Sequence, residues 1–396
     1  MTRLSRNREF IALAGTEVLS VIGDQLSRVA LALLVFERTG SAGLSGLTYA
    51  MTYLPTVAGG LLLSPLADRR PRRGVSVAID AIRSVIVLTM ALPGISLTAM
   101  CCLVAASSFL TGPYTATRLA LLRDVLPQEQ YGPGMALRQS LSQGGQLVGF
   151  CSGGFIATAF TPATCLLVDG LTFAAAALIV RTLVSARPAV AAAGASSTVT
   201  TTFRVIWRSP ARRAIFLSTF MGLFLTAPKA LSVPLASELH LSDRWVGIFM
   251  ASEGLFSVVT LAIFAKFVTA AQYKKLFPLV CLAPGLPLLT ALAVHNPYLI
   301  MLVFGVSGAI WSVLTVIAAS SLAELLPDDQ RGRGMGIAAS TNATAQGVGA
   351  FMAGFATDEI GAGLSITLLG FLSILFALAP AALWNRAATP ANALAS

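Results

Sequence analysis

The sequence predicts an all-α membrane protein with twelve transmembrane helices in two pseudo-symmetric six-helix bundles. Three observations lead to this fold class: an excess of apolar residues, a one-sided distribution of basic residues, and an internal repeat. Duplicated helical bundles of this kind are typical of transporters.

The composition excludes the water-soluble enzyme classes. Of the 396 residues, 56% are hydrophobic and 11% are charged, and the mean hydropathy is +0.79. Soluble domains carry about 25% charged residues. Because a membrane-spanning helix takes about 20 residues, a chain of this length accommodates roughly twelve spans with short loops and no sizeable soluble domain.

Hydropathy and loop signals divide the chain into segments that must be helical, because lipid offers no partner for backbone polar groups. We expect an N-terminal six-helix bundle over 1–184, a cytoplasmic linker over 185–210 and a C-terminal six-helix bundle over 211–396. The expected spans are 9–36, 42–67, 75–93, 95–122, 133–160, 162–184, 211–236, 245–268, 274–294, 296–325, 334–357 and 361–384.

Basic residues predict the orientation of the bundle. Of 27 Lys and Arg, 20 lie at the termini, in every second loop or in the linker, two lie in the opposite loops, and five lie within spans. Basic loops stay in the cytoplasm, so we expect both termini on that side of a bacterial inner membrane. Scattered arginines make no continuous basic face, which argues against a nucleic-acid partner.

An internal repeat relates the two halves. Residues 325–355 align without gaps on residues 125–155, and 12 of the 31 positions are identical. The shared positions include Pro127/Pro327, Gly134/Gly334, Gly149/Gly349 and Gly154/Gly354. The chain is therefore predicted to be a duplicated six-helix unit with its substrate near the membrane midplane.

The loop after the second span, SPLADRRPRRG (64–74), resembles the cytoplasmic signature of the major facilitator superfamily. Asp68, Arg69, Arg72 and Arg73 match the signature, whereas a serine and a proline replace its two glycines. The resemblance implies the major-facilitator fold and a gating role for these residues, in which Asp68 meets the N-terminus of helix 11, where a carboxylate is favoured. The alternative is that the arginines only anchor the topology.

The fifth span carries a second signature. Gly145, Gly149, Gly153 and Gly154 fit the glycine pattern of the antiporter branch of that superfamily, with Phe150 in place of its proline. The resemblance implies antiport. The alternative is close helix packing, which small residues four apart permit.

Several fragments are similar to the drug:proton antiporter-3 branch, the group of macrolide and siderophore exporters. They are NREF at the amino end, LSVIGDQLSRVALALLVFERTGSA in the first span, the Asp80/Arg83 pair in the third and DGLTF in the sixth. This resemblance implies efflux of an amphipathic organic compound, such as a drug, an antibiotic or a siderophore-like metabolite.

Charged residues inside spans are candidates for function, because each costs about 3 kcal/mol at the bilayer centre. Glu17, Asp24 and Glu253 are the proton-coupling candidates, since a desolvated carboxylate that faces a cavity can bind and release a proton. Alternatively, Arg28 neutralises Asp24, and Lys229 pairs with Glu253.

The other charges within spans are expected to be structural or to lie at a boundary. Asp80 and Arg83, three residues apart near the cytoplasmic end of the third span, are expected to pair with each other as part of the gate. Asp169 is expected to be structural, because the sixth helix is peripheral in the major-facilitator fold. Arg118 and Arg138 are expected to snorkel to the cytoplasmic boundary.

Four aromatic residues are candidates for the substrate cavity, since amphipathic rings suit a site for large organic molecules. Tyr49 and Tyr53 are four residues apart in the second span and are expected to share one helix face, while Tyr114 lies in the fourth span and Trp311 in the tenth. The alternative is that these rings are ordinary core or interface residues.

The sequence therefore predicts a secondary active transporter that exports its substrate in exchange for protons by alternating access. We expect a monomer in the lipid bilayer that carries a small amphipathic compound and uses no cofactor, with the proton gradient as its energy source. A proton-coupled or facilitative importer is the main alternative. A membrane enzyme or scaffold is the remote one, since the sequence has two histidines, both in expected outer loops, and no metal-binding cluster or nucleotide-binding motif.

One prediction tests the loop signature. Asp68→Asn removes the charge that is expected to meet helix 11, so turnover in proteoliposomes should slow while expression stays unchanged. Turnover equal to that of the wild-type protein would reduce the loop to a topology anchor.

Overall fold

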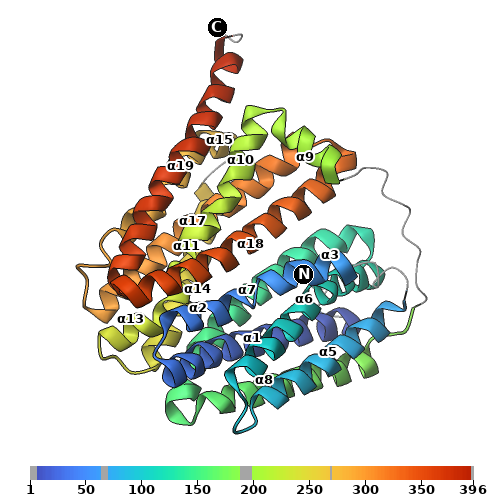
Figure 1. The fold of residues 1–396 in the computed structure, drawn as a ribbon. Helices are drawn as coiled ribbons and strands as arrows, with labels where there is room; N and C mark the ends of the chain where they lie inside the picture. The colour runs from blue at the N-terminus through green and yellow to red at the C-terminus, as the bar shows by residue number, and fades with distance from the viewer. Residues whose placement is uncertain (1–6, 64–69, 188–198, 268–269, 394–396) are drawn as a thin grey trace. The chain divides into compact units, whose positions relative to one another are not determined.

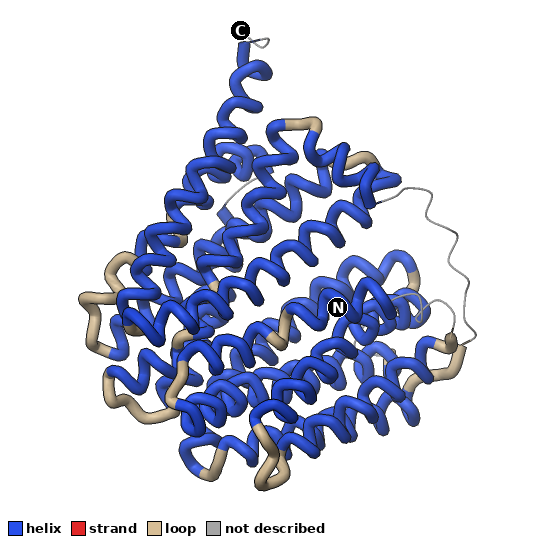
Figure 2. Tube along the Cα trace, in the orientation of Figure 1, coloured by secondary structure: helices blue, strands red, loops and turns tan. Residues whose placement is uncertain are grey.

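The structure is a computed structural model, and it describes residues 7–63, 70–187, 199–267 and 270–393. Within these ranges every regular element is a helix (Figure 1 and Figure 2), which confirms the all-α fold class. The first half of the chain contains α1 (Arg8–Thr39), α2 (Ala42–Ala50), α3 (Leu54–Leu63), α5 (Arg72–Met90), α6 (Leu97–Val125), α7 (Gln128–Ala159) and α8 (Pro162–Leu183).

The second half begins with a short helix in the expected linker, α9 (Val199–Trp207). The elements that follow it are α10 (Pro210–Ser218), η2 (Thr219–Met221), α11 (Gly222–Leu225), α12 (Ala227–Ala230), α13 (Ser232–Glu238), α14 (Arg244–Phe267), α15 (Ala270–Leu282), α16 (Gly285–Leu288), α17 (Pro297–Leu325), α18 (Asp328–Ile360) and α19 (Ala362–Ala393).

Each expected span contains helix in the described part of the chain, but three of them are interrupted. Span 42–67 divides into α2 and α3, because Pro55 has no N–H to donate to the carbonyl four residues earlier. Spans 211–236 and 274–294 divide in the same way, and both contain prolines. By length and composition, six of the described helices can cross a membrane, or seven with the bent pair over 210–238, so twelve crossings stay a prediction.

Local sequence signals set the ends of the helices. The Asn7 side chain accepts a hydrogen bond from the Phe10 N–H at 3.1 Å and caps α1, and Ser96, Thr161 and Asn296 cap α6, α8 and α17 in the same way. At the other end of α1, Gly40 adopts a left-handed φ of 64°, a conformation that glycine adopts without strain.

Contacts divide the chain into two compact units. The first unit comprises Met1–Gly40, Met51–Ala193 and Leu241–Ala251, and the second comprises Ser41–Ala50, Gly194–His240 and Ser252–Ser396. By this division α2 belongs with the helices of the second half, and the start of α14 belongs with those of the first half. The two six-helix bundles expected from the sequence stay a prediction.

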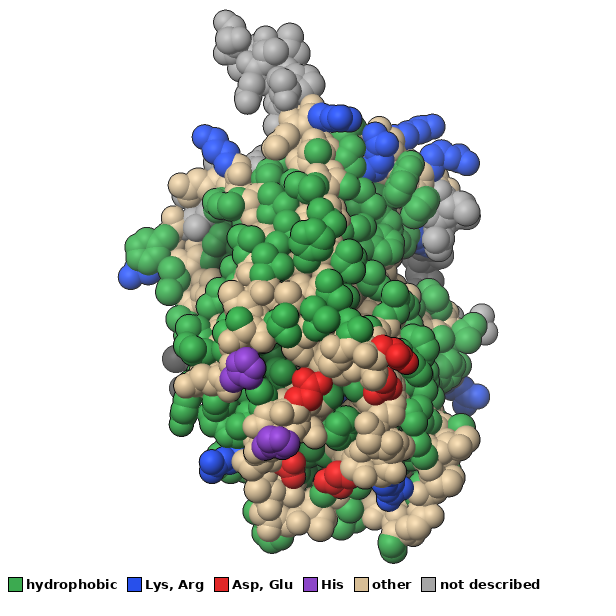
Figure 3. Space-filling model, turned by 60° about the vertical axis from the view of Figure 1, so that its left-hand side comes forward, with side chains coloured by type: hydrophobic (Ala, Val, Ile, Leu, Met, Phe, Trp, Pro, Cys, Tyr) green, Lys and Arg blue, Asp and Glu red, His purple; other side chains and the backbone are tan. Residues whose placement is uncertain are grey.

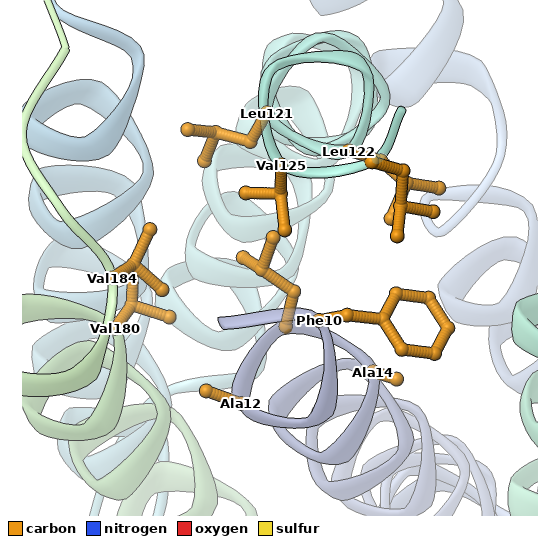
Figure 4. Packing of buried hydrophobic residues seen from close by; sticks show 10 residues of the cluster. Phe10, Ala12, Ala14, Leu121, Leu122, Val125, Val180 and Val184 are labelled. Carbon is orange, nitrogen blue, oxygen red and sulfur yellow. The ribbon is translucent and has the colours of Figure 1, made fainter. Parts of the chain in front are cut away.

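In the first unit, α1 packs on α7 and α8, while α5 packs on α6 and α8. Figure 4 shows a buried cluster at the beginning of α1, where apolar side chains of α1, α6 and the end of α8 converge. The labelled members are Phe10, Ala12, Ala14, Leu121, Leu122, Val125, Val180 and Val184. Burial of this apolar surface away from solvent or lipid headgroups stabilises the packing of the three helix ends against each other.

In the second unit, α18 packs along α2, and α19 packs on α10, α15 and α16. The Asp358 carboxylate of α18 closes the N-terminus of α2: it accepts hydrogen bonds from the Ala42 N–H at 2.6 Å, the Gly43 N–H at 2.9 Å and the Ser41 hydroxyl at 2.7 Å. A negative charge is favoured at this end of a helix, where backbone N–H groups lack partners.

The internal repeat has the same local structure in both copies. The bounds of α6 and α17 differ by 200 residues at each end, and α7 and α18 each begin directly after a proline, Pro127 or Pro327. Gly134 and Gly334 then lie against the side chains of Leu126 and Leu326, which an added Cβ would push aside. The duplication inferred from the sequence is therefore a duplication of structure over these four helices.

Charged side chains are unevenly distributed on one face of the molecule. On the face in Figure 3, several Lys and Arg side chains gather near the C-terminal end of the chain, whereas the Asp and Glu side chains and both histidines lie toward the opposite end, where fewer Lys and Arg are seen. This separation agrees with the charge asymmetry of the sequence. The cytoplasmic location of the termini stays a prediction.

The α2 cap leads to a stability prediction. Asp358→Ala leaves the first N–H groups of α2 without their acceptor, so we expect a loss of about 1 kcal/mol and a lower midpoint of thermal unfolding in detergent. Glu359→Ala is the matched control, because this exposed neighbour has no hydrogen bond to α2. Equal midpoints for the two variants would show that the cap contributes nothing to stability.

Candidate functional site

Among the ion pairs of the first unit, three join an arginine on one helix to an acid of another helix that lies inside an expected span. Arg83 Nη2 lies 2.7 Å from Asp24 Oδ1, Arg118 Nη2 lies 3.1 Å from Asp80 Oδ2, and Arg138 Nη2 lies 2.5 Å from Glu17 Oε1. The pairs join α5 to α1, α6 to α5, and α7 to α1. Neutralising charges in this way is what the membrane interior requires of buried ionisable groups.

The expected pair between Asp80 and Arg83 is wrong. Arg83 turns toward α1, where it binds Asp24, and its Nε donates to the Ser107 hydroxyl at 3.3 Å. Its guanidinium also lies 4.1 Å from the centre of the Phe173 ring of α8. Residues three apart on a helix are neighbours, but here each of the two finds a closer partner on an adjacent helix.

Asp80 instead pairs with Arg118, and neither side chain is accessible to solvent by more than 2%. The same guanidinium donates from Nη1 to the Thr16 hydroxyl at 2.9 Å. Arg118 was expected to snorkel to the boundary, and its burial between α1, α5 and α6 corrects that expectation. A buried carboxylate is what holds this arginine in the interior.

Arg138 also departs from the snorkelling expectation, because two hydrogen-bonding contacts hold it against Glu17. The pair lies beside Arg118 in a small pocket between α1, α6 and α7, whose apolar wall includes Phe10 and Leu122. Glu17 is therefore a half-buried acid with a cation at contact distance. Its proton-coupling role stays a prediction.

Asp24 has a different partner from the one considered in the sequence. The sequence offered Arg28 as the residue that neutralises Asp24, but the structure pairs Asp24 with Arg83. The Nη1 of Arg28 instead donates to Gln25 Oε1 at 3.2 Å, and the Arg28 guanidinium lies 5.3 Å from the centre of the Tyr53 ring. Asp24 is the more exposed member of its pair, with 30% of its side chain accessible. It thus combines an ion pair with access from outside the helix packing.

Asp169 of α8 was expected to be structural, yet it lies next to this charged cluster. The residue is 1% exposed, and its carboxylate accepts hydrogen bonds from the hydroxyls of Ser27 and Thr172. Within the described ranges no Lys, Arg or His lies within ion-pair distance of it. Gly23 of α1 packs directly against Asp169 and Thr172, so a side chain there would displace the carboxylate.

Sequence reasoning missed this position because it assigned α8 to the periphery of the bundle. The available signal was the spacing on α1: Ser27 lies three residues after Asp24, on the same helix face. The Asp24–Arg83 pair and the Ser27–Asp169 contact therefore belong to one polar cluster, with Phe173 of α8 beneath the guanidinium.

In the second unit, the alternative considered for Glu253 is borne out. Its Oε2 lies 2.9 Å from the Lys229 Nζ. The Glu253 side chain also packs on Gly308 of α17, where any Cβ would collide with it. Glu253 is thus fixed by one cation and by close packing, and its role in proton coupling stays a prediction.

The aromatic candidates are divided between the two units: Tyr53 and Tyr114 belong to the first, and Tyr49 and Trp311 belong to the second. Tyr49 is buried on α2 in the second unit, whereas Tyr53 lies in the turn after α2 in the first unit, so the expectation of a shared helix face is wrong. The helix break before Pro55 is the physical reason. Tyr114 of α6 is 7% exposed, and its ring centre lies 4.9 Å from the Arg118 guanidinium, inside the charged cluster.

Trp311 of α17 lies in the wall of a cavity of about 140 Å³ within the second unit. The cavity is formed by α10, the 3₁₀ turn η2, α17 and α18. None of its lining residues is charged. Of the four aromatic candidates, this one borders the larger cavity.

The glycines of the fifth span pack against α1 and α14. Gly145, Gly149 and Gly153 face Val18, Ile22 and Val29 of α1, and Gly154 faces Gly247 of α14. Their geometry is that of close helix crossing.

The repeat explains which of these glycines are required. Gly149 and Gly154 approach backbone atoms of the neighbouring helix, and their counterparts Gly349 and Gly354 do the same against α11 and the start of α2. The positions equivalent to Gly145 and Gly153 are alanines in the second copy. Packing accounts for the pattern, and its link with antiport stays a prediction.

The gating candidates are only partly described. Asp68 and Arg69 lie outside the described residues. Arg72, the first residue of α5, forms an ion pair with Asp124 near the end of α6 at 2.7 Å, which joins two neighbouring helix ends. Within the described ranges no group of three or more His, Cys, Asp or Glu is arranged to hold a metal ion.

A family model supplies the deciding comparison. The model described as Major Facilitator Superfamily matches residues 13–230 and 215–395, which together cover nearly the whole chain. The protein belongs to the Major Facilitator Superfamily. The predicted membership of the superfamily is thereby confirmed, and the drug:proton antiporter-3 branch stays a prediction.

Solved structures show that this superfamily member has the fold of known transporters. It superposes on a mutant of the nucleoside transporter NupG with a TM-score of 0.75 and 15% identity, covering 95% of this chain and 99% of that one. For a peptide transporter POT mutant the TM-score is 0.74 at 15% identity, over 96% and 94% of the two chains.

A bacterial homolog of the human lysosomal transporter Spinster, in an inward-facing and unoccupied conformation, gives a TM-score of 0.74 at 12% identity, over 96% and 97%. At these identities the likeness shows the fold alone.

A curated relative agrees with the family. The uncharacterized MFS-type transporter YkuC of Bacillus subtilis (strain 168) is 25% identical over 179 residues, which are 44% of this chain. The match spans 42% of that relative, less than half of its length. The protein is therefore a multi-pass membrane protein of this superfamily, and its transport activity and substrate are matters for proposal.

The buried Asp80–Arg118 pair gives a prediction about the folding of this superfamily member. Asp80→Leu alone strands the Arg118 guanidinium in the interior and should cost about 3–5 kcal/mol, whereas Asp80→Leu combined with Arg118→Met removes both charges and should recover most of that loss. Thermal unfolding midpoints of the single and double variants in detergent measure the difference. A double variant no more stable than Asp80→Leu would contradict the pairing.

Proposed function

We propose that this protein is a proton-coupled secondary transporter that exports an amphipathic organic compound by alternating access. The proton gradient would supply the energy, with no further cofactor. The proposal rests chiefly on the polar cluster of the first unit, where Asp169 lies buried beside the Asp24–Arg83 pair.

The chemistry of the cluster suits a proton carrier. A fully buried carboxylate with hydroxyl groups as its hydrogen-bond donors is costly when ionised, and a bound proton removes that cost. The guanidinium of Arg83 contacts Asp24 directly and lies over the ring of Phe173, which belongs to α8, the helix that also carries Asp169. Loss of the proton from Asp169 would set two carboxylates in competition for Arg83.

This competition gives a physical route from a proton to a conformational change. Arg83 lies on α5, Asp24 on α1, and Asp169 on α8, so a shift of Arg83 between the two acids changes the forces among three helices of one unit. Alternating access requires a change of this kind, in which ligand or proton binding favours one of two arrangements.

The direction of transport is supported by resemblance. The fragments that resemble the drug:proton antiporter-3 branch favour efflux of an amphipathic compound, and the glycine pattern of α7 favours antiport. Uptake of a small solute is the competing direction within the same superfamily.

Asp169→Asn tests the coupling. The amide keeps the size of the side chain but cannot release a proton, so efflux of ethidium from proteoliposomes driven by an opposing pH gradient should fall about ten-fold or more. Exchange of ethidium across the membrane without a gradient should persist, because it needs no net proton movement. Glu359→Gln, an exposed acid-to-amide change in the second unit, serves as the control and should behave as the wild-type protein.

Asp24→Asn tests the other acid of the cluster. It leaves Arg83 without its charged partner, so gradient-driven efflux should be lost while expression stays intact. If efflux were unchanged in both the Asp24 and Asp169 variants, neither acid would couple protons, and Glu17 and Glu253 would be the remaining candidates. Accumulation of substrate in the same direction as the proton flux would establish the import alternative.

A further inference from the structure

The repeat places two equivalent pockets in the protein, one in each unit. In the first unit the pocket lies between α1, α6 and α7, and in the second unit it lies between α10, α17 and α18. Since α17 and α18 repeat α6 and α7 with an offset of 200 residues, Leu122 and Leu322 occupy equivalent positions, and each lines its own pocket.

The two pockets differ at the positions where the first carries charge. Arg118 and Arg138 line the first pocket and bind Asp80 and Glu17 there. The residues 200 positions later are Ala318 and Ala338, and both line the second pocket. Replacing two guanidinium side chains with methyl groups leaves a larger space: the cavity is about 140 Å³ in the second unit and about 10 Å³ in the first.

The second cavity is apolar with a polar margin. Trp311, Leu314 and Met335 provide its larger apolar side chains. Hydroxyls of α10 and η2 and the amide of Asn342 provide the polar groups, and the Asn342 side chain is held close to Gly222, where a Cβ would lie 2.8 Å from its Oδ1. Such a surface suits a ligand group that is apolar over most of its area and accepts or donates one hydrogen bond.

The volume and the lining together select the kind of group. A cavity of about 150 Å³ lined by apolar side chains is large enough for one benzene ring. The cavity here is open on the side of Ala319 and Ala339, which are exposed. An ionised group would enter this cavity without a partner of opposite charge, which is costly. An aromatic ring also matches the flat face of Trp311, since aromatic pairs gain about 0.5–1.5 kcal/mol beyond their burial.

We propose that the cavity between α10, α17 and α18 binds an uncharged aromatic ring of the transported compound. That the bound compound is transported rests on the function proposed above, but the binding of the ring does not. The first unit would then supply the proton chemistry, and the second unit would supply the site for the apolar part of the substrate.

The binding is measured with the full chain in lipid nanodiscs at neutral pH and without a gradient. The probe is 4-bromobenzyl alcohol, an uncharged single ring whose bromine quenches tryptophan fluorescence at short range. We expect saturable quenching on top of the linear component that comes from partition of the probe into lipid. The saturable part should disappear in Trp311→Phe, because the remaining tryptophans lie outside the cavity lining.

Two leucine variants should fill the cavity without disturbing the packing of buried residues. Ala319 and Ala339 line the cavity and are exposed, so leucine at either position occupies its space with little strain elsewhere. Each should weaken saturable quenching about ten-fold or more, equivalent to about 1.4 kcal/mol. Ala356→Leu, at an exposed position of α18 outside the lining, is the matched control and should quench as the wild-type protein does.

Two further probes test the chemistry of the site. 4-Bromobenzoate carries a negative charge on the same ring and should give no saturable quenching. 6-Bromohexanol carries the same bromine and hydroxyl on a flexible chain. If it quenched as strongly as the ring and with the same sensitivity to leucine, the cavity would be a crevice for lipid acyl chains, and the proposal would be overturned.

Quenching that survives Trp311→Phe or both leucine variants would also overturn the proposal. Failure here is distinct from failure of proton coupling. Asp169→Asn and Asp24→Asn lie in the first unit and should bind the ring probe normally even where they abolish gradient-driven efflux. Conversely, normal coupling with no saturable ring binding would leave the proposed function intact and remove this site.

Discussion

The constraint on which the rest of this structure depends is the cost of an uncompensated charge in the membrane interior. The first unit meets it by pairing acids and arginines from different helices: Asp24 with Arg83, and Asp80 with Arg118. Each pair fixes the rotation of two helices about their own axes, because the side chains must face each other. A third pair, Glu17 with Arg138, joins α1 to α7, and the close glycine crossings between those two helices bring the pair within reach.

Much of the fold could be predicted from the sequence because it is encoded locally. Capping residues such as Asn7 and Asn296, and the Leu-Pro step before α7 and α18, mark helix ends within a few residues. Apolar composition predicts helices in lipid, and the repeat predicts that Gly149 and Gly349 share one environment. The pairing of Lys229 with Glu253 was also within reach, since few charges are available to neutralise each other.

The rest depends on which helix faces meet, and a single sequence does not specify that. Asp80 and Arg83 are near neighbours on α5, yet they point to α6 and α1 respectively. Asp169 lies beside Ser27 because α8 packs on α1, which the sequence alone does not specify. The helix break before Pro55 separates Tyr49 from Tyr53. It was not predicted, because a hydropathy profile does not register a missing backbone hydrogen bond.

The charges on α5 have a consequence for how the chain enters the membrane. This helix is not among the described helices that are apolar enough to cross on their own. During synthesis Asp24 precedes it, but Arg118, the partner of Asp80, emerges only with α6. Because Asp and Arg each oppose insertion of a lone helix by about 2.5–3.5 kcal/mol, α5 must be held near the translocon until α6 arrives. Helices α1, α5 and α6 would therefore partition into lipid as a group rather than one at a time.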